Sequence, residues 1–536
     1  MKPIQNLKSY FTQDFIPGFM VFLLALPLSL GIAKASDFPA ITGILTAIIG
    51  GILVTFFSGA PLTIKGPAAG LIVIASGAVT EFGGGEAGWR LALATIVVAG
   101  IIQILFGLLK FGKLSELFPI AAIHGMLAAI GIIIMSKQIH ILLGIPPSEL
   151  KGKEPLQLLA MLPSSILHEN AHITEIGIAC LLILILHSLI SNQKIKKIPA
   201  PLIVLAVSIP LGLALHIKTE GAIANFSLVK VGDFSEIFKS GFFNVDFSGF
   251  FTHTGTFIEY VILFALIGSI ESMLTVKAMD KISSQKKKSN ANKDLLAIGI
   301  GNTISGITGG LPMISEVARS SANIGYGAKS KMSNFFHGLF LLFAVLFAVP
   351  YIEMIPNAAL AAMLIFVGFK LAHPKEFKHM YEIGLDQLLI FCATIVTTLA
   401  TDLLIGVGTG MLMEVIVNLF HGMRLSHLFK VDYQIENISE NETRINVESE
   451  LVFTNFISFR ERLNRIEIGR NLTFNLSNSN VIDHSAFVAL EDFKNTFENS
   501  GGKVKIIGHE NHHQLSSHSK STRKKLKHSK PNFNPN

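Results

Sequence analysis

Residues 309–323 combine two glycines, a proline, three serines, a glutamate and an arginine inside a long apolar chain. Such broken backbone at membrane depth must be wrapped in protein or line a cavity, because unpaired backbone groups are costly in hydrocarbon. Arg319 is therefore a candidate functional residue. Ser320 and Ser321 beside it could donate hydrogen bonds to an oxyanion or bond back to their own helix. The alternative for the whole stretch is a short loop at the membrane surface.

A second segment, residues 58–70, repeats the order of glycine, proline, a short extended apolar piece and a restart into helix. Paired Gly/Pro-interrupted segments at corresponding positions of two repeats indicate a transporter's binding site. We expect two half-helices whose N-termini face one space, an arrangement that favours an anion. Pro67 is expected in the first turn of one half-helix. The candidate anion-binding residues are Gly66, Pro67, Ala68, Ala69, Arg319, Ser320 and Ser321.

A carboxylate in an otherwise apolar stretch supplies a candidate coupling-ion site. Glu271 lies in the middle of the predicted helix 256–276, and Thr275 follows one turn later on the same face. Glu271 could bind H⁺ or, with the Thr275 hydroxyl, Na⁺. The alternative is a structural ion pair between Glu271 and Arg319. No cofactor and no other metal site is expected, and neither Cys180 nor Cys392 suggests a disulfide.

The composition indicates an integral membrane protein. Of the 536 residues 50% are hydrophobic and only 15% charged, whereas soluble domains contain about 25% charged residues. About 14 apolar runs are long enough to span a membrane. They form two sets of seven, and because seven is odd, the second set crosses the membrane with inverted polarity. Lysines and arginines collect in the loops that lie inside if the N-terminus is cytoplasmic. The net charge of +7 then reflects topology and does not indicate nucleic acid binding. The predicted spans are 15–33, 39–57, 62–80, 90–109, 119–142, 172–191, 199–217, 256–276, 294–309, 312–325, 333–351, 356–371, 384–400 and 402–420.

The apolar character stops near His421, and a small α/β domain is predicted beyond it. Its expected strands are 443–447, 450–456, 471–476 and 503–507, and its expected helices are 458–466 and 487–498. The predicted domain boundaries are 1–14 for a cytoplasmic N-terminus, 15–421 for the transmembrane domain, 422–440 for a linker, 441–510 for the α/β domain and 511–536 for a basic, His-rich disordered tail.

The combination of motifs resembles the SulP (sulfate permease) anion transporters. The motifs are Leu26-Pro27-Leu28-Ser29, Gly66-Pro67-Ala68-Ala69-Gly70, Gly268-Ser269-Ile270-Glu271-Ser272, Gly309-Gly310-Leu311-Pro312, Ala318-Arg319-Ser320-Ser321-Ala322-Asn323 and Val481-Ile482-Asp483-His484-Ser485-Ala486. The resemblance implies an all-α polytopic membrane protein with a 7+7 inverted repeat, divided into core and gate (scaffold) domains, followed by a cytoplasmic α/β STAS domain. It places two half-helices with short strands around the anion, and it implies a homodimer.

The resemblance also assigns roles to individual residues. Arg319 matches the family's arginine after the strand of span ten, and Glu271 matches its span-eight carboxylate. Where that carboxylate is Asp with Thr one turn on, as in a sodium-dependent bicarbonate transporter, the pair matches Glu271 and Thr275, and glutamate in place of aspartate leaves Na⁺ versus H⁺ open. Asp483 and Ser485 match a phosphorylatable site of related STAS proteins, which suggests a regulatory site for a cytoplasmic partner. The C-terminal residues 508–513 resemble a bacterial branch often encoded beside carbonic anhydrases, which favours bicarbonate over sulfate.

The sequence therefore predicts an ion-coupled secondary active transporter of an inorganic anion, bicarbonate or sulfate, that works by alternating access. It is expected in the lipid of a bacterial inner (plasma) membrane with both termini cytoplasmic. The alternatives are a dicarboxylate/H⁺ symporter, a nucleobase-type permease and a STAS-linked signalling protein without net transport. An enzyme is not expected, because no nucleophile, base and orienting group stand out together.

Overall fold

The chain folds into two compact units, each with its own core. The computed structural model describes residues 3–112, 118–150, 153–196, 198–217, 227–231, 245–283, 289–439, 441–463, 466, 470–499 and 501–525. The first unit comprises the described residues of Met1–Ser115 and Ile130–Leu371, and the second those of Glu116–Ala129 and Ala372–Asn536.

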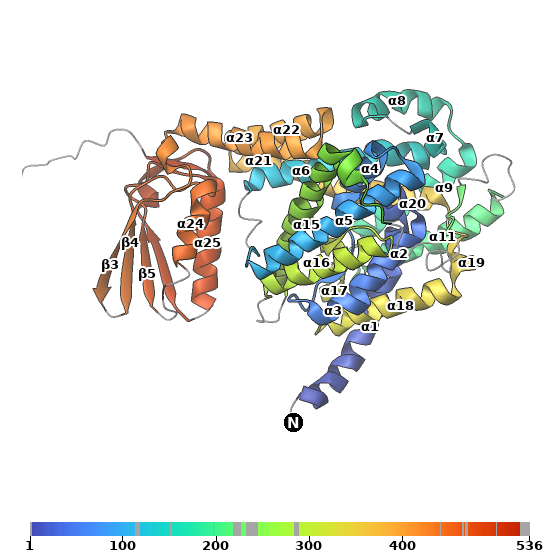
Figure 1. The fold of residues 1–536 in the computed structure, drawn as a ribbon, viewed down its shortest axis with the longest axis horizontal. Coiled ribbons are helices and arrows are strands. Elements are labelled where there is room, and N and C mark those ends of the chain that lie inside the picture. The colour runs from blue at the N-terminus through green and yellow to red at the C-terminus, as the bar shows by residue number, and fades with distance from the viewer. Residues whose placement is uncertain are drawn as a thin grey trace, which may run out of the picture. The chain divides into compact units, whose positions relative to one another are not determined.

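The first unit is a bundle of apolar helices (Figure 1). Of the described helices in the whole chain, eight are long and apolar enough to cross a membrane, and five shorter apolar helices accompany them. Helix α6 is shared with the second unit, and its end packs against α9, α11 and α20 in one apolar cluster. The helices are α1 (Pro3–Ala35), α2 (Ala40–Ile48), η1 (Ile49–Leu53), α3 (Val54–Phe57), η2 (Ala69–Leu71), α4 (Ile72–Glu81), α5 (Gly85–Leu108), α6 (Ile120–Leu142), α7 (Pro147–Leu150), α8 (Pro155–Leu167), α9 (Ala171–Leu189), α10 (Gln193–Lys196), α11 (Ala200–Ala214), α14 (Gly249–Thr252), α15 (Thr254–Ile282), α16 (Ala291–Ile307), α17 (Val317–Gly325), α18 (Met332–Phe347), α19 (Val349–Ile352) and α20 (Asn357–Leu371).

Helices α5 and α16 lie side by side (Figure 1). Small residues allow this close approach. A Cβ atom on Gly100 would lie 2.5 Å from the Thr303 nitrogen, and one on Gly299 would lie 2.5 Å from the Ile104 nitrogen. Backbone contact of this kind is typical of helices that associate in a membrane. It fixes α16, the helix that precedes the second broken segment.

The two broken segments meet as a short antiparallel sheet. Strand β1 (Ile64–Pro67) pairs with β2 (Met313–Glu316). Pro67, expected in a first helical turn, instead ends β1 opposite Met313. A proline is tolerated at the edge of such a pair because it needs no N–H partner there. The helix restarts only at Ala69, as a single 3₁₀ turn that leads into α4.

Side chains satisfy the backbone that precedes β2. The Leu311 nitrogen donates to Thr46 Oγ1 at 2.7 Å, and the Leu311 carbonyl accepts from Ser305 Oγ at 2.7 Å. The Met313 nitrogen donates to Asn302 Oδ1 at 2.6 Å. These bonds meet the requirement that irregular backbone at membrane depth be paired within the protein.

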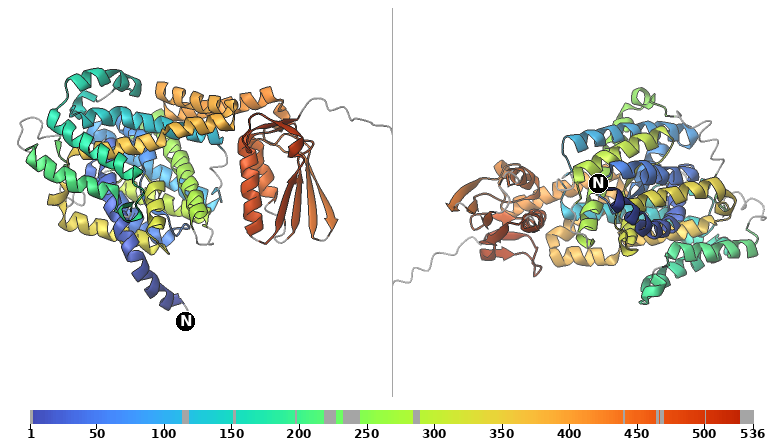
Figure 2. Two further views of the ribbon diagram at one scale, coloured as in Figure 1. Left: turned by 180° about the vertical axis from the view of Figure 1, so that it is seen from behind. Right: turned by 90° about the horizontal axis from the view of Figure 1, so that it is seen from below.

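The second unit contains three helices and an α/β domain. A four-stranded sheet has the order β3-β4-β5-β7, with the β4–β5 and β5–β7 pairs parallel. Helices α24 and α25 lie together on one face of this sheet (Figures 1 and 2). Their aromatic and aliphatic side chains form its core. The elements are α21 (Pro374–Ile383), α22 (Leu385–Ala400), α23 (Leu403–His421), η5 (Leu425–His427), β3 (Tyr433–Ser439), β4 (Glu442–Val447), α24 (Phe453–Leu463), β5 (Asn471–Asn475), β6 (Val481–Ile482), α25 (His484–Asn499), β7 (Lys503–Ile507), η6 (His509–Asn511), β8 (His512–Gln514) and β9 (Arg523–Lys525).

The expectation of a helical membrane protein followed by a small α/β domain is confirmed. Three details of the C-terminal part were wrong. Strand β3 lies in the expected linker 422–440, and residues 453–456 begin a helix instead of a strand. Part of the expected disordered tail forms β8 and β9, because β9 pairs with both β6 and β8. The remainder of that tail, residues 526–536, lies outside the described residues.

Candidate functional site

The site is centred on Arg319, in the first turn of α17. Glu316 caps this helix, since its Oε2 accepts a hydrogen bond from the Arg319 nitrogen at 2.7 Å. The same oxygen lies 3.9 Å from Arg319 Nε, too far for a hydrogen bond. The guanidinium is fully buried, and Nε, Nη1 and Nη2 have no hydrogen-bond partner among the described residues. A buried guanidinium with open donors suits a carboxylate or another oxyanion, which it binds through two parallel hydrogen bonds.

Strand β1 brings the first broken segment against this guanidinium. A Cβ atom on Gly66 would lie 2.6 Å from Arg319 Nη1, so the absence of a side chain at Gly66 makes room for the arginine. Pro67 and Ala68 follow and are buried, and Ala69 is half-buried where the helix restarts. The structure therefore brings Gly66 and Arg319 together, as the paired segments predict.

The two serines after Arg319 already have partners in the protein. Ser320 Oγ accepts from the Ile64 nitrogen at 2.9 Å and donates to the Glu316 carbonyl, one turn back in its own helix. Ser321 Oγ contacts Met279 Sδ at 3.8 Å. Ser320 thus ties β1 to α17, and the contribution of either hydroxyl to ligand binding stays a prediction.

Glu271 and Thr275 both lie on α15, and both are buried. Glu271 Oε1 and Thr275 Oγ1 have no hydrogen-bond partner among the described residues. A Cβ atom on Gly70 would lie 2.1 Å from Glu271 Oε1, which places the carboxylate against the start of the restarted helix. In the described part of the chain Glu271 forms no ion pair with Arg319 within 4 Å, so the alternative of a structural pair is not observed.

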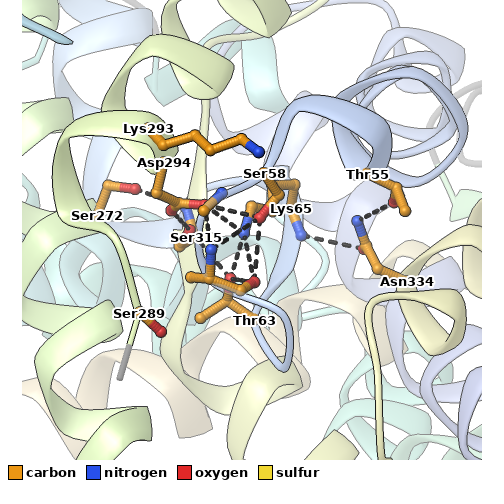
Figure 3. Close-up of polar contacts among 12 residues, drawn as sticks. Thr55, Ser58, Thr63, Lys65, Ser272, Ser289, Lys293, Asp294, Ser315 and Asn334 are labelled. Carbon is orange, nitrogen blue, oxygen red and sulfur yellow. Dashed lines mark hydrogen bonds and ion pairs between the residues drawn. The ribbon is translucent and has the colours of Figure 1, made fainter. Parts of the chain in front are cut away.

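Lys65 and Asp294 form a buried network that the sequence analysis missed (Figure 3). Lys65 Nζ lies 3.0 Å from Asp294 Oδ1, and both side chains are fully buried. Asp294 Oδ1 also accepts from Ser58 Oγ at 2.8 Å, and its Oδ2 accepts from Ser315 Oγ at 2.9 Å. The pair therefore joins both broken segments to the start of α16. An intramembrane lysine and aspartate were visible as a signal, but 229 residues separate them.

A second anchor holds the opposite side of β1. The Lys65 nitrogen donates to Asn334 Oδ1 at 3.2 Å, and Asn334 Nδ2 donates to the Gly50 carbonyl at 2.9 Å and to Thr55 Oγ1 at 2.8 Å. One turn later on α18, His337 is fully buried, and neither of its ring nitrogens has a hydrogen-bond partner among the described residues. Sequence reasoning had not singled out Asn334 or His337.

Comparison with known proteins identifies this architecture. Residues 11–394 match the sequence profile of the sulfate permease family, and residues 433–512 match that of the STAS domain. The chain belongs to the sulfate permease family. It therefore belongs to a family of membrane transporters and not of enzymes, as the sequence analysis expected.

Two curated relatives illustrate where this sulfate permease family member lies. It is 27% identical over 515 residues to YvdB of Bacillus subtilis, named as a sulfate transporter, covering 93% of this chain and 91% of YvdB. It is 26% identical over 437 residues to the bicarbonate transporter BicA of a Picosynechococcus species, covering 81% of this chain and 74% of BicA.

Two solved structures share the fold. The transmembrane domain of a cyanobacterial BicA superposes with a TM-score of 0.63 at 23% identity, covering 75% of this chain and 97% of that one. The murine anion transporter Slc26a9 in its inward-facing state gives a TM-score of 0.66 at 15% identity, covering 92% of this chain and 85% of that one. At these identities the likeness shows the fold alone.

The candidate STAS regulatory residues lie at the start of α25. Asp483 Oδ1 caps this helix by accepting from the Ala486 nitrogen at 2.7 Å, and Oδ2 accepts from the Phe453 nitrogen at 2.8 Å and from Asn418 Nδ2 at 3.1 Å. Ser485 Oγ accepts from the Ile120 nitrogen at 3.1 Å. Both side chains are buried where the STAS domain meets α6 and α23 within the second unit. A modifying enzyme could reach them only after this contact opens.

Proposed function

We propose that this sulfate permease family member is a secondary active transporter of a small inorganic oxyanion, bicarbonate or sulfate. Its anion site comprises Arg319 and the segment from Gly66 to Ala69. Its coupling site for H⁺ or Na⁺ comprises Glu271 and Thr275. Transport occurs by alternating access, in which helices that carry the site move against the remaining helices.

The observation that carries this proposal is the environment of Arg319. Burying a charge without a hydrogen-bonding partner is costly, and the guanidinium is fully buried with all three nitrogens open. An oxyanion beside Gly66 would accept from this fork, and its negative charge would be favoured by the nearby starts of α4 and α17. With a neutral nucleobase, the guanidinium would keep only Glu316 as a charged neighbour among the described residues, 3.9 Å from Nε and beyond hydrogen-bond distance, which argues against the nucleobase-type permease.

The choice of bicarbonate and sulfate rests on the chemistry of the guanidinium and on the names of the relatives. Bicarbonate and sulfate both present oxygens to a guanidinium, and the names of BicA and YvdB give one anion each. A dicarboxylate presents the same group, so it belongs in the same test.

The coupling proposal rests on two side-chain oxygens that lack a hydrogen-bond partner among the described residues. Glu271 Oε1 and Thr275 Oγ1 lie one turn apart on α15 and lack hydrogen-bond partners among the described residues. An oxygen pair of this kind binds Na⁺, and the carboxylate alone binds H⁺. The Glu271 carboxylate packs against Gly70, next to the anion segment, with no room for a Cβ atom between them. Ion binding at Glu271 and anion binding at the segment can therefore influence one another.

The membrane setting is part of the proposal. The lysine distribution supports cytoplasmic termini, and the bacterial relatives support a bacterial plasma membrane. A homodimer, an inverted repeat and a cytoplasmic partner at the STAS domain complete the proposed assembly.

Uptake by purified protein in proteoliposomes tests the function. Labelled bicarbonate, sulfate, fumarate and uracil are supplied separately, with and without Na⁺ and pH gradients. Gradient-driven accumulation of bicarbonate or sulfate supports the proposal, and accumulation of fumarate alone identifies a dicarboxylate symporter. Uptake of uracil alone, or no flux of any of the four with folded protein, contradicts the proposal.

A further inference from the structure

A cavity with a mainly apolar lining and several polar side chains lies in the first unit, away from Arg319. It has a volume of about 120 Å³ and lies between α1, α6 and α20. Lys34 lines it one residue before the end of α1, Lys137 and Gln138 in the last two turns of α6, and Asn357 at the start of α20. None of its lining residues comes from β1, β2, α15 or α17. Because α1 starts at the N-terminus and ends at this cavity, the cavity lies toward the membrane face opposite the N-terminus.

The helices that line the cavity belong to two apolar clusters, and α20 contributes to both. Helices α1, α2 and α18 share one apolar cluster, whereas the end of α6 packs with α9 and α11 in another. Polar contacts cross between these groups. Lys34 Nζ donates to Asn357 Oδ1 at 2.6 Å, and Lys137 Nζ lies 2.9 Å from Asp37 Oδ2. A movement of one group against the other would change the shape of this cavity.

Among the described residues that line the cavity, positive charge exceeds negative charge. Lys34 and Lys137 line it together with a single carboxylate, Asp37. Lys230 lies close enough to Lys34 to repel it. Within the described part of the chain Lys34 makes one hydrogen bond, to a neutral amide, although an ammonium has three donors. A bound anion would offset the repulsion and accept from the remaining donors.

Gln138 adds an observation of a different kind. Its side chain is 3% exposed and lines the cavity, yet its amide makes no hydrogen bond within the described part of the chain. The amide of Asn357, by contrast, is held by the Leu228 carbonyl at 2.9 Å. The polar atoms of the Gln138 amide stay accessible to solvent, although the residue as a whole is buried. Its NH₂ group is available to an oxygen of a ligand in the cavity.

We propose that this cavity, lined by Lys34, Lys137, Gln138 and Asn357, is a second anion site that takes a small inorganic oxyanion at the face opposite the N-terminus before it reaches Arg319. The inference rests on the proposed function in that the same anion is transported. It adds an entry site that consists of different residues on different helices.

Transport kinetics measured separately from each face of the membrane test this site. Intact cells and inverted vesicles expose opposite faces, and protease access to an N-terminal tag assigns them. Lys34→Met and Gln138→Leu should raise the half-saturating concentration of sulfate or bicarbonate at the opposite face about tenfold, as expected for one lost charged hydrogen bond. The half-saturating concentration at the N-terminal face and the maximal rate should stay within about twofold of the wild-type values. Lys34→Arg should have nearly the affinity of the wild type. Lys153→Met, which changes an exposed lysine outside the cavity, is the matched control.

A binding measurement separates this site from the transport function. Gln138→Cys is introduced with Cys180→Ala, Cys392→Ala and Arg319→Ala, and its labelling by a cationic thiol reagent is timed. Sodium sulfate or sodium bicarbonate should slow labelling relative to sodium gluconate. Protection without uptake by the wild type would retain this site and reject the proposed function. Equal labelling in all three salts, or loss of maximal rate without a sided change in affinity, would overturn this site while leaving transport intact.

Discussion

Lys65 Nζ and Asp294 Oδ1 lie 3.0 Å apart with both side chains fully buried, although 229 residues separate them in the chain. The carboxylate also accepts hydrogen bonds from the backbone of Gly59 at 3.2 Å and Ala60 at 3.1 Å. The pair thus fixes the first broken segment to α16, while Ser315 fixes the second. This arrangement positions β1 so that Gly66 faces Arg319.

Removing one partner of this pair should destabilise the transporter. Asp294→Asn leaves the buried Lys65 ammonium without its counter-charge, and Lys65→Met leaves the buried Asp294 carboxylate without its counter-charge. Either change lowers the free energy of unfolding by about 3–5 kcal/mol. Thermal unfolding of the purified protein should show a clear loss of Tm for each single variant. The double variant Lys65→Met/Asp294→Asn should lose less Tm than the sum of the losses of the two single variants. Lys293→Gln, at the neighbouring exposed position, is the control and should leave the Tm unchanged.

Gly70→Ala should impair ion coupling more than folding. The added Cβ atom would lie 2.1 Å from Glu271 Oε1 and 2.5 Å from its Cδ, so the flexible end of Glu271 must move. We expect gradient-driven accumulation to fall about tenfold, equivalent to about 1.4 kcal/mol, with the Tm nearly unchanged. Gly408→Ala is the control, because a Cβ atom there meets nothing within 4 Å. Full accumulation by Gly70→Ala would contradict the placement of Glu271 at the coupling site.

Asp483 should give the STAS contact a pH dependence. Burial raises the pKa of Asp483 to about 6, above its ordinary value of 3.8, and the nearby Asp386 adds to the rise. Between these two values the folded contact binds more protons than the open one. The free-energy penalty that ionised Asp483 imposes on the closed contact therefore has its maximal value above pH 6 and disappears as the pH falls toward 4.

The measurement is hydrogen exchange at the start of α25, in wild type and in Asp483→Asn, between pH 5 and 8. The carboxylates of Asp386 on α22 and Glu414 on α23 lie near Asp483. Burial lowers the pKa of the neighbouring His484 to about 4, with an opposite effect on stability. The difference between the two proteins reports the charge of Asp483 together with its effect on the nearby Glu414. Stability of the wild type relative to Asp483→Asn should increase as the pH falls through 6. A constant difference over this range would contradict the assignment.

The sequence predicted the elements of the site better than their connections. Glycine and proline revealed both broken segments, and the isolated Arg319 and Glu271 stood out against an apolar background. Each of these signals is local. The pairing of Lys65 with Asp294 depends on tertiary structure and has no local signal. Pro67 was placed in a helix because its strand forms only when β2 lies beside it.

The same reasoning explains the errors at the C-terminus. The His- and Lys-rich composition of residues 511–525 has no strand periodicity, and β9 forms because Val481 and Ile482 offer a partner edge. Conversely, each of the fourteen predicted spans contains an observed helix, because apolar length is a strong local signal, although the spans 62–80 and 312–325 begin with strands β1 and β2. The cavity beside Lys34 and Gln138 could not be predicted, since it depends on how three distant helices pack.

The most direct test of the central claim is uptake of labelled bicarbonate and sulfate by Arg319→Ala in proteoliposomes. Losing two charged hydrogen bonds to the anion should lower kcat/KM about a hundredfold or more, and Arg319→Lys should recover part of it. Arg90→Gln, which changes an arginine that pairs with exposed Glu86 and lies outside the site, should transport like the wild type. Unchanged uptake by a folded Arg319→Ala variant would contradict an anion site at Arg319.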